Sequence, residues 1–248
     1  MLWSTLVRAL DLVGLRGPAR QAKKSLEARL RPVGLSDWTP LVPEQEFENS
    51  LRTALRALRA AAGSDPTGAY LEFGVSRGTS TACAFRALRA EGLDAVPMIG
   101  FDSFKGMPPE AARQGWEPGQ YHSTLRATRR YLAGQGVPPG RVQLVKGWFR
   151  DTLTPATRDR LGLRQASLVL VDCDIHSASC EALAFVAPLI GAHAVLVFDD
   201  WGWRADRGEI GQKEAFEAFM AANPGLRASS LPAYIPQARV FLLSRQGG

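Results

Sequence analysis

A chain of 248 residues with 46% hydrophobic and 22% charged residues has the composition of an ordinary globular protein, which excludes disordered and fibrous classes. The three cysteines are an odd number without a CxxC spacing, which argues against a disulfide framework and a zinc site. The formal charge of +6 is concentrated in residues 1–31, and the nearly neutral remainder argues against a nucleic-acid partner. No apolar run is long enough for a transmembrane segment, and Arg8 and Asp11 interrupt the N-terminal apolar stretch, so we expect a cytoplasmic protein.

The N-terminal segment is predicted to be an appendage. Apolar residues recur at spacings of four, four and three from Leu2 to Val13, which predicts an amphipathic helix over residues 2–14. The proline-containing stretch after it is typical of a linker, so we divide the chain into a basic helical extension (1–43) and one domain (44–248). The apolar face of the helix favours docking within a homo-oligomer; the protein's own body and an anionic membrane surface are the alternatives.

A repeating pattern of strands and helices begins at residue 44. Short apolar runs followed by polar or turn residues predict strands, and the longer segments between them predict helices. Such alternation is typical of a doubly wound, mostly parallel α/β sheet, because parallel neighbours need a crossover connection. The predicted strands span residues 69–73, 97–101, 142–146, 168–172 and 194–198, and the predicted helices span 44–62, 79–90, 123–134, 177–190 and 210–222.

The pattern changes after Pro224. The apolar runs at 227–231 and 238–244 are separated by too few residues for another crossover helix. They predict a hairpin-like pair at the sheet edge, which brings the expected sheet to seven strands.

The first candidate site follows the first strand, within the segment YLEFGVSRGTS (residues 70–80). In open parallel sheets a ligand binds beyond the carboxyl ends of the strands, and Gly74 allows the backbone to turn tightly and approach it. Glu72 would repel a pyrophosphate but suits an ammonium group, while serine hydroxyl groups or the N–H groups at the helix start suit a carboxylate. The segment therefore predicts a site for S-adenosylmethionine, with a purely structural glycine turn as the alternative.

Asp102 follows the second predicted strand and supports this assignment. A carboxylate at the tip of the adjacent strand suits the two hydroxyl groups of a ribose, as it does in other Rossmann-type cofactor sites. A turn-forming role before Ser103 is the alternative. The glycine loop and Asp102 together indicate a nucleoside cofactor.

The second candidate site is acidic. Asp172 and Asp174 follow the fourth predicted strand, and Asp199 and Asp200 follow the fifth. Like charges brought together are costly unless a cation compensates them, and an all-oxygen cluster favours Mg²⁺ over Zn²⁺. We predict that Asp172, Asp199 and Asp200 bind the metal, whereas Asp174 lies behind them or caps the next helix; a set of helix caps and solvated turns is the alternative.

Taken together, these motifs resemble the macrocin O-methyltransferase family, the magnesium-dependent sugar O-methyltransferases of macrolide and aminocoumarin biosynthesis. The resemblance runs from about residue 68 to residue 222 and includes five segments in order. They are YLEFGVSRGTS, GFDSFKGMP at 100–108, KGWFRDTL at 146–153, VDCD at 171–174, and FDDW at 198–201, which is followed by a Glu-containing helix near 210–219.

The resemblance implies the class I methyltransferase fold and a set of site residues. The implied metal ligands are again the three aspartates, and the implied acceptor is a hydroxyl group of a sugar. The chain departs from the family pattern at His176, where the family usually has Tyr, and at Ala192-His193, which replaces a Gly-Gly pair. The implied cofactor-binding residues are Glu72, Gly74, Ser80, Asp102 and Ser103, with Gly147 and Trp148 bordering the adenine.

Methyl transfer to a hydroxyl group needs a base that removes the proton. His122 is a candidate, because it ends a loop of about twenty residues, rich in Gly and Pro, that is typical of a lid. Asp172 is the competing base, His176 is a third option, and His193 is a poor one. Four aromatic residues are expected near the mouth of the site and fit a glycoside or a flat aromatic acceptor: Trp116, Tyr121, Trp201 and Trp203.

Two alternative functions are compatible with these features. One is a magnesium-dependent catechol-type O-methyltransferase, which would act on an aromatic diol. The other is a non-catalytic scaffold that keeps the cofactor fold and works through its N-terminal helix. Binding of the methyl donor and turnover of sugars or catechols discriminate among the three.

Overall fold

The computed structural model describes residues 42–66, 68–202 and 210–246. The chain falls into two units, residues 1–39 and 40–248, and the fold described here belongs to the second. The helix predicted over residues 2–14 and Trp203 lie outside the described residues. The homo-oligomer that this helix favours therefore stays a prediction.

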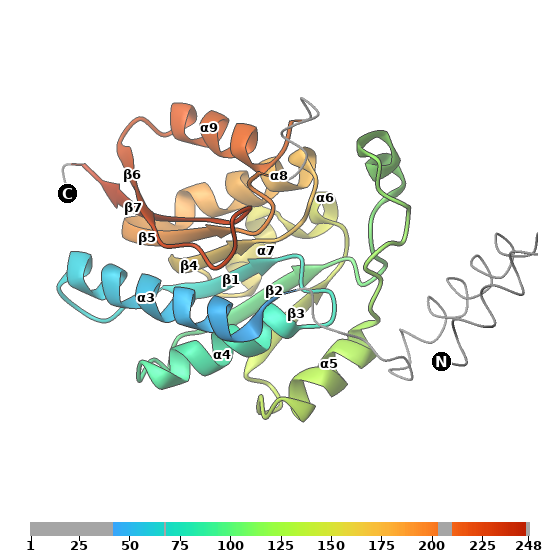
Figure 1. Cartoon of the computed structure of the whole chain (residues 1–248), viewed down its shortest axis with the longest axis horizontal. Helices are drawn as coiled ribbons and strands as arrows, with labels where there is room; N and C mark the ends of the chain where they lie inside the picture. The colour runs from blue at the N-terminus through green and yellow to red at the C-terminus, as the bar shows by residue number, and fades with distance from the viewer. Residues whose placement is uncertain (1–41, 67, 203–209, 247–248) are drawn as a thin grey trace, which may run out of the picture. The chain divides into compact units, whose positions relative to one another are not determined.

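Within the described residues, seven strands form one sheet in the order β3-β2-β1-β4-β5-β7-β6 (Figure 1). The neighbours among β1 to β5 are parallel, whereas β7 is antiparallel to both β5 and β6. The predicted pair of C-terminal strands at the sheet edge is therefore confirmed. The strands are β1 (Ala69–Phe73), β2 (Met98–Asp102), β3 (Val142–Lys146), β4 (Ala166–Val171), β5 (Ile190–Phe198), β6 (Leu226–Leu231) and β7 (Arg239–Arg245).

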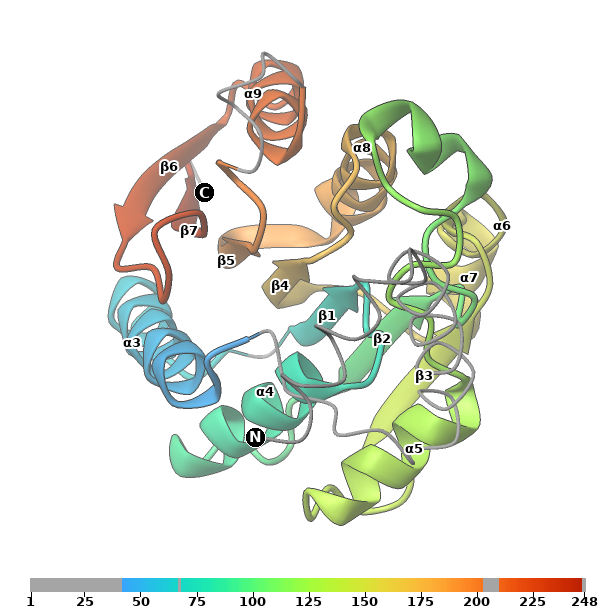
Figure 2. The same ribbon diagram turned by 45° about the vertical axis from the view of Figure 1, so that its right-hand side comes forward.

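The central strands are apolar on both faces because helices cover both faces (Figure 2). Tyr70 and Leu168 belong to one hydrophobic cluster, together with residues of the helices α3 (Glu44–Ala62), α4 (Thr79–Ala90) and α5 (Leu125–Gly134). Leu71 and Val169, one position further along the same strands, belong to a second cluster with residues of α8 (His176–Val186) and α9 (Gln212–Ala222). This alternation confirms the predicted doubly wound sheet.

The described helices connect the strands, and none of them is long and apolar enough to cross a bilayer. The bounds of the longer helices are α3 (Glu44–Ala62), α4 (Thr79–Ala90), α5 (Leu125–Gly134), α8 (His176–Val186) and α9 (Gln212–Ala222). The short helical segments are η2 (Pro109–Gln114), α6 (Phe149–Thr152), α7 (Pro155–Arg160) and η3 (Ala187–Leu189).

The structure differs from the sequence-based expectation mainly in short segments. Three segments were not predicted, η2, α6 and α7, because each is too short to show a helical repeat of apolar residues. Among the three, only α7 has a side-chain cap: Thr154 accepts a hydrogen bond from the N–H of Thr157 at 3.2 Å and precedes Pro155. β5 begins at Ile190 rather than at residue 194, and its pairing with β4 shifts register before the predicted apolar run begins.

Candidate functional site

The chain turns sharply at Gly74, directly after β1. Gly74 has a φ of 93°, and a Cβ atom there would lie 1.7 Å from the carbonyl oxygen of Asp172. Only glycine therefore allows β1 and the end of β4 to approach so closely. Gly78, with a φ of 98°, is the N-cap of α4, so residues 74–78 form a tight loop at the carboxyl edge of the sheet.

Asp102, at the end of the neighbouring strand β2, holds this loop in place. Its carboxylate accepts hydrogen bonds from the backbone N–H groups of Val75 at 2.8 Å, Ser76 at 2.7 Å and Phe104 at 2.5 Å. Burial raises the pKa of Asp102, while the three N–H donors and the nearby His122 act in the opposite direction. The residue predicted to contact a ribose thus also shapes the loop.

Glu72 lies beneath the loop and is completely buried. It accepts hydrogen bonds from the hydroxyl groups of Tyr70 at 2.9 Å, Thr81 at 2.6 Å and Ser80. Burial raises the pKa of Glu72 to about 7, although these three hydroxyl donors lower it. Glu72 and Ser80 therefore join β1 to the first turn of α4, the two elements that the loop connects, and their direct contact with a cofactor stays a prediction.

The raised pKa of Glu72 gives a testable pH dependence of stability. Between its ordinary pKa of 4.5 and about 7, the folded protein binds a proton that the unfolded chain releases, so stability is lost as pH rises through this window. Glu72→Gln should abolish this loss, which is on the order of 3 kcal/mol. Urea unfolding of both proteins between pH 5 and about pH 8 measures the difference.

Glu91 provides a control of opposite sign. Hydrogen bonds and charges from Arg56 and Arg52 lower the pKa of Glu91, so its contribution to stability is lost as pH falls. Glu91→Gln should therefore change the profile only at acid pH. If the profiles of Glu72→Gln and wild type run parallel between pH 5 and about pH 8, the carboxyl group of Glu72 is not the source of the dependence.

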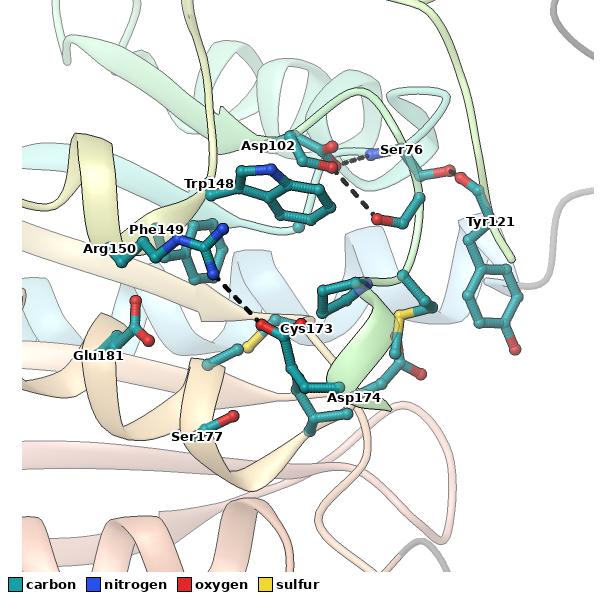
Figure 3. Close-up of a pocket in the computed structure, with 18 of the residues that line it drawn as sticks. Ser76, Asp102, Tyr121, Trp148, Phe149, Arg150, Cys173, Asp174, Ser177 and Glu181 are labelled. Atoms are coloured by element: carbon teal, nitrogen blue, oxygen red, sulfur yellow. Dashed lines mark hydrogen bonds and ion pairs between the residues drawn. The ribbon is translucent and has the colours of Figure 1, made fainter. Parts of the chain in front are cut away.

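A cavity opens beside the loop at the carboxyl edge of the sheet (Figure 3). Its walls come from the loop after β1, the ends of β2 and β3, the segment from 103 to 121, and the start of α8. The indole of Trp148 lies on one side of the cavity, and Ser177 and Glu181 lie on the other (Figure 3). The structure brings five of the seven predicted cofactor-binding residues to this cavity: Gly74, Asp102, Ser103, Gly147 and Trp148.

The predicted lid forms one wall of the cavity. Its two ends are joined by hydrogen bonds from the N–H of Met107 to the carbonyl of Gln120 at 2.9 Å and from the N–H of Gly119 to the carbonyl of Met107 at 2.8 Å. The lid also has a small hydrophobic cluster with the start of α8, which includes Trp116 and Ile175. These contacts hold the segment against the start of α8, and its role as a lid stays a prediction.

The three predicted metal ligands meet at the ends of β4 and β5. Carboxylate oxygens of Asp172, Asp199 and Asp200 all lie within 4.8 Å of one another. Burial, followed by the charges of the other two, raises the pKa of Asp172 well above its usual range. Asp199 accepts a hydrogen bond from Tyr234, whereas Oδ2 of Asp200 is buried without a partner among the described residues. Converging carboxylates with an unpaired buried oxygen fit a divalent cation with oxygen ligands.

Asp174 links the acidic cluster to the cavity. It lines the cavity, and its backbone has a φ of 60°, which is uncommon for a residue with a side chain. Burial and the charge of Asp199 raise the pKa of Asp174 to about 7. The alternative that Asp174 caps α8 is not supported, because the N-cap residue is Ile175 and no side chain caps that helix.

The three histidines occupy different surroundings. His122 does not line the cavity, and its electrostatic effect is to lower the pKa of Asp102. His176 begins α8 and lies 3.6 Å from the sulfur atom of Cys180. His193 bonds to Ser244 at 3.0 Å in the first half of β5, away from the acidic strand end, so the structure keeps it apart from the site.

Of the three expected mouth aromatics that the structure describes, Tyr121 lines the cavity, Trp116 lies in the lid beside it, and Trp201 lies elsewhere. Trp116 and Tyr121 pair within the lid, with ring centroids 5.7 Å apart. Trp201 instead packs against Phe216 and Phe241, with centroids at 5.5 and 5.1 Å. The sequence placed Trp201 next to the acids, but its ring turns toward the apolar face of α9.

Two residues that contact the acidic cluster were not predicted from the sequence. Tyr234 reaches Asp199 from the connection between β6 and β7, and its ring also packs edge-on against Phe47 of α3 at 4.6 Å. Gln212, the first residue of α9, bonds to the backbone at the ends of both β4 and β5. Neither contact has a local sequence signal, because each joins segments that only the fold brings together.

The chain is similar to known methyltransferases. A family described as "Methyltransferase domain" matches residues 71–201, more than half of the chain. A curated relative from Streptomyces olivaceus, named 8-demethyl-8-(2,3-dimethoxy-alpha-L-rhamnosyl)-tetracenomycin-C 4'-O-methyltransferase, is 28% identical over 152 residues. That match covers 58% of this chain and 56% of the relative, so the chain spans about half the length of the protein it matches.

Solved structures show the same fold. The O-methyltransferase NovP superposes with a TM-score of 0.65 at 18% identity, over 88% of each chain. The calicheamicin methyltransferase CalS11 superposes with a TM-score of 0.58 at 21% identity, over 91% of this chain and 93% of that one. These similarities agree with the resemblance indicated by the five motifs. The chain belongs to the methyltransferase domain family and has the class I methyltransferase fold.

Proposed function

We propose that the protein is an S-adenosylmethionine-dependent, Mg²⁺-assisted O-methyltransferase that acts on a sugar hydroxyl of a small molecule. The observation that carries this proposal is the junction between the two candidate sites. Asp172 belongs to the acidic cluster, while the next two residues, Cys173 and Asp174, line the cavity. A methyl donor in the cavity and a hydroxyl group at the acids would thus be neighbours, as methyl transfer requires.

The cavity offers complementary groups for each part of the methyl donor. The loop from Gly74 to Ser76 suits the amino-acid end, and Glu72 joins the strand before that loop to the helix after it. Asp102 suits the ribose hydroxyl groups, because a carboxylate oxygen can accept further hydrogen bonds beyond those from the backbone. Trp148 provides a flat apolar wall for the adenine.

Asp172, Asp199 and Asp200 would hold the magnesium ion. When bound, this ion supplies Lewis acidity that lowers the pKa of an acceptor hydroxyl group. The protein's own contribution is rigidity: Tyr234 fixes Asp199, and the ends of β4 and β5 are joined by the backbone hydrogen bond from Asp199 to Val171 at 3.2 Å.

The reaction itself is an in-line displacement. The acceptor oxygen forms a bond to the methyl carbon while the carbon–sulfur bond breaks, and the electron pair of that bond stays on sulfur as a neutral thioether. The hydroxyl proton passes to a base of the protein. Asp172 and His122 are the two candidates, and Asp172 is nearer to the junction of the two sites.

His122→Ala tests this assignment. We expect turnover within about threefold of wild type, because His122 does not line the cavity. Its side chain contributes only to lowering the pKa of Asp102. The measurement is kcat as a function of pH at saturating methyl donor. If His122 were the base, its loss would lower kcat by about a hundredfold or more and would remove the change in kcat near neutral pH. That outcome would identify His122 as the base.

The proposal of a sugar acceptor is supported by the curated relative, whose name specifies a rhamnosyl group as part of its substrate. Purified protein with Mg²⁺ and the methyl donor should produce demethylated cofactor and a methyl ether when rhamnosylated compounds are supplied. Catechols, tested in parallel, should give no product. Turnover of catechols alone would identify a catechol-type enzyme, and failure to bind the methyl donor in calorimetry would identify a non-catalytic scaffold.

A further inference from the structure

Gln212 bridges the two strand ends that carry the acidic cluster. This first residue of α9 is completely buried. Its side-chain Nε2 donates a hydrogen bond to the carbonyl oxygen of Val171 at 3.0 Å, and its Oε1 accepts one from the N–H of Asp200 at 3.0 Å. One amide group thus contacts the residue before Asp172 and the backbone of Asp200.

These two hydrogen bonds continue the sheet where its own ladder stops. The last backbone bond between β4 and β5 runs from the N–H of Asp199 to the carbonyl of Val171 at 3.2 Å. Directly after this bond, the amide of Gln212 connects the carbonyl of Val171 to the N–H of Asp200. Leucine or methionine would fill the space but provide neither bond, and glutamate would lack the donor that faces Val171.

The start of α9 keeps this amide in place. The N–H of Gly211 donates to Oε2 of Glu214 at 2.7 Å, which fixes the first turn of the helix. Phe216 and Phe219 of the same helix are buried in the core beneath it. The bridge is therefore attached to a packed element, and it uses the backbone N–H of Asp200, so the carboxylate of Asp200 takes no part in it.

We infer that Gln212 is a positioning residue that sets the separation between Asp172 and Asp200 for a divalent cation. The inference rests on the proposed function, because it concerns the metal ligands of that site. Residues that orient metal ligands typically change metal affinity by about 10-fold to 100-fold when they are replaced. Cofactor binding should be independent of Gln212, which does not line the cavity.

The test compares Gln212→Met with Lys213→Met. Lys213 is the next residue of the same helix, is about half exposed and pairs with Glu217, so its replacement alters α9 without touching the strands. Mn²⁺ is the probe, and free Mn²⁺ is measured by electron paramagnetic resonance. Gln212→Met should weaken Mn²⁺ binding at least tenfold, whereas Lys213→Met should bind Mn²⁺ like wild type and both should bind the methyl donor within about twofold of wild type.

Kinetics give a second readout. In Gln212→Met the metal concentration for half-maximal rate should rise about tenfold, while kcat at saturating Mg²⁺ returns to within a few-fold of wild type. A purely structural role would lower kcat without this rescue. Equal Mn²⁺ affinity in the two variants would overturn the inference, whereas absence of Mn²⁺ binding in wild type would overturn the proposed metal role and this inference with it.

Nuclear magnetic resonance of the wild-type protein covers the case in which Gln212→Met does not fold. Addition of Mg²⁺ should shift the side-chain amide signals of Gln212 and the backbone amide signal of Asp200 with the same midpoint. Gln212 signals that stay unchanged at saturating Mg²⁺, while the Asp200 signal moves, would overturn the inference.

Discussion

Asp199→Asn should reduce kcat by at least about a thousandfold and leave the affinity for the methyl donor within about twofold of wild type. The substitution removes one negative charge and one oxygen ligand from the acidic cluster, so the acceptor hydroxyl group keeps its proton. A thousandfold loss corresponds to about 4 kcal/mol of transition-state stabilisation. The asparagine can still accept the hydrogen bond from Tyr234, so the fold should be preserved. Steady-state kinetics and calorimetry with the methyl donor measure the two effects.

Asp159→Asn is the matched control for this substitution. Asp159 is largely exposed and pairs with Arg164 at 3.5 Å, outside the cavity and the acidic cluster. An exposed pair of this kind contributes little, so wild-type activity is expected. Full activity of Asp199→Asn in the presence of EDTA would refute the metal role of the cluster.

The arrangement of the site was predictable from the sequence because it depends on strand ends. In a parallel sheet, residues after successive strands meet at one edge, so the positions of Gly74, Asp102 and Asp172 in the chain were enough to place them together. The apolar runs that predicted the strands are the buried segments of the central sheet.

The contacts that stabilise the site were not predictable in this way. Glu72 could be read as a ligand for an ammonium group, but its three hydroxyl donors come from Tyr70 and from the first turn of α4. Tyr234 and Gln212 act from segments that follow Asp199 by more than ten residues, and no motif singles out either residue. Such contacts depend on packing at a distance, which the periodicity of a sequence does not encode.

Gly74→Ala should cause the largest loss of stability among single substitutions in the loop of residues 74–78. The new methyl group would lie 1.7 Å from the carbonyl oxygen of Asp172 and 2.7 Å from its carbonyl carbon, and both are backbone atoms. Relief of this contact requires the ends of β1 and β4 to separate, although they are joined by the hydrogen bond from the N–H of Asp172 to the carbonyl of Phe73 at 2.9 Å. We expect a loss of more than about 4 kcal/mol in the free energy of unfolding, measured with urea.

Gly63→Ala is the control that measures the cost of backbone strain without the steric contact. Gly63 ends α3 with a φ of 66°, close to the left-handed conformation that Gly74 also requires, but nothing lies within 4 Å of its added Cβ atom. Alanine there should cost about 1 kcal/mol, the strain of a left-handed residue with a side chain. The difference between the two variants therefore measures how closely β1 approaches β4. If both variants lost the same free energy of unfolding, the positive φ alone would explain why glycine is required at position 74. If Gly74→Ala instead lost several kcal/mol more and also lost binding of the methyl donor and Mn²⁺, the close approach of β1 and β4 would be what holds the two sites in register.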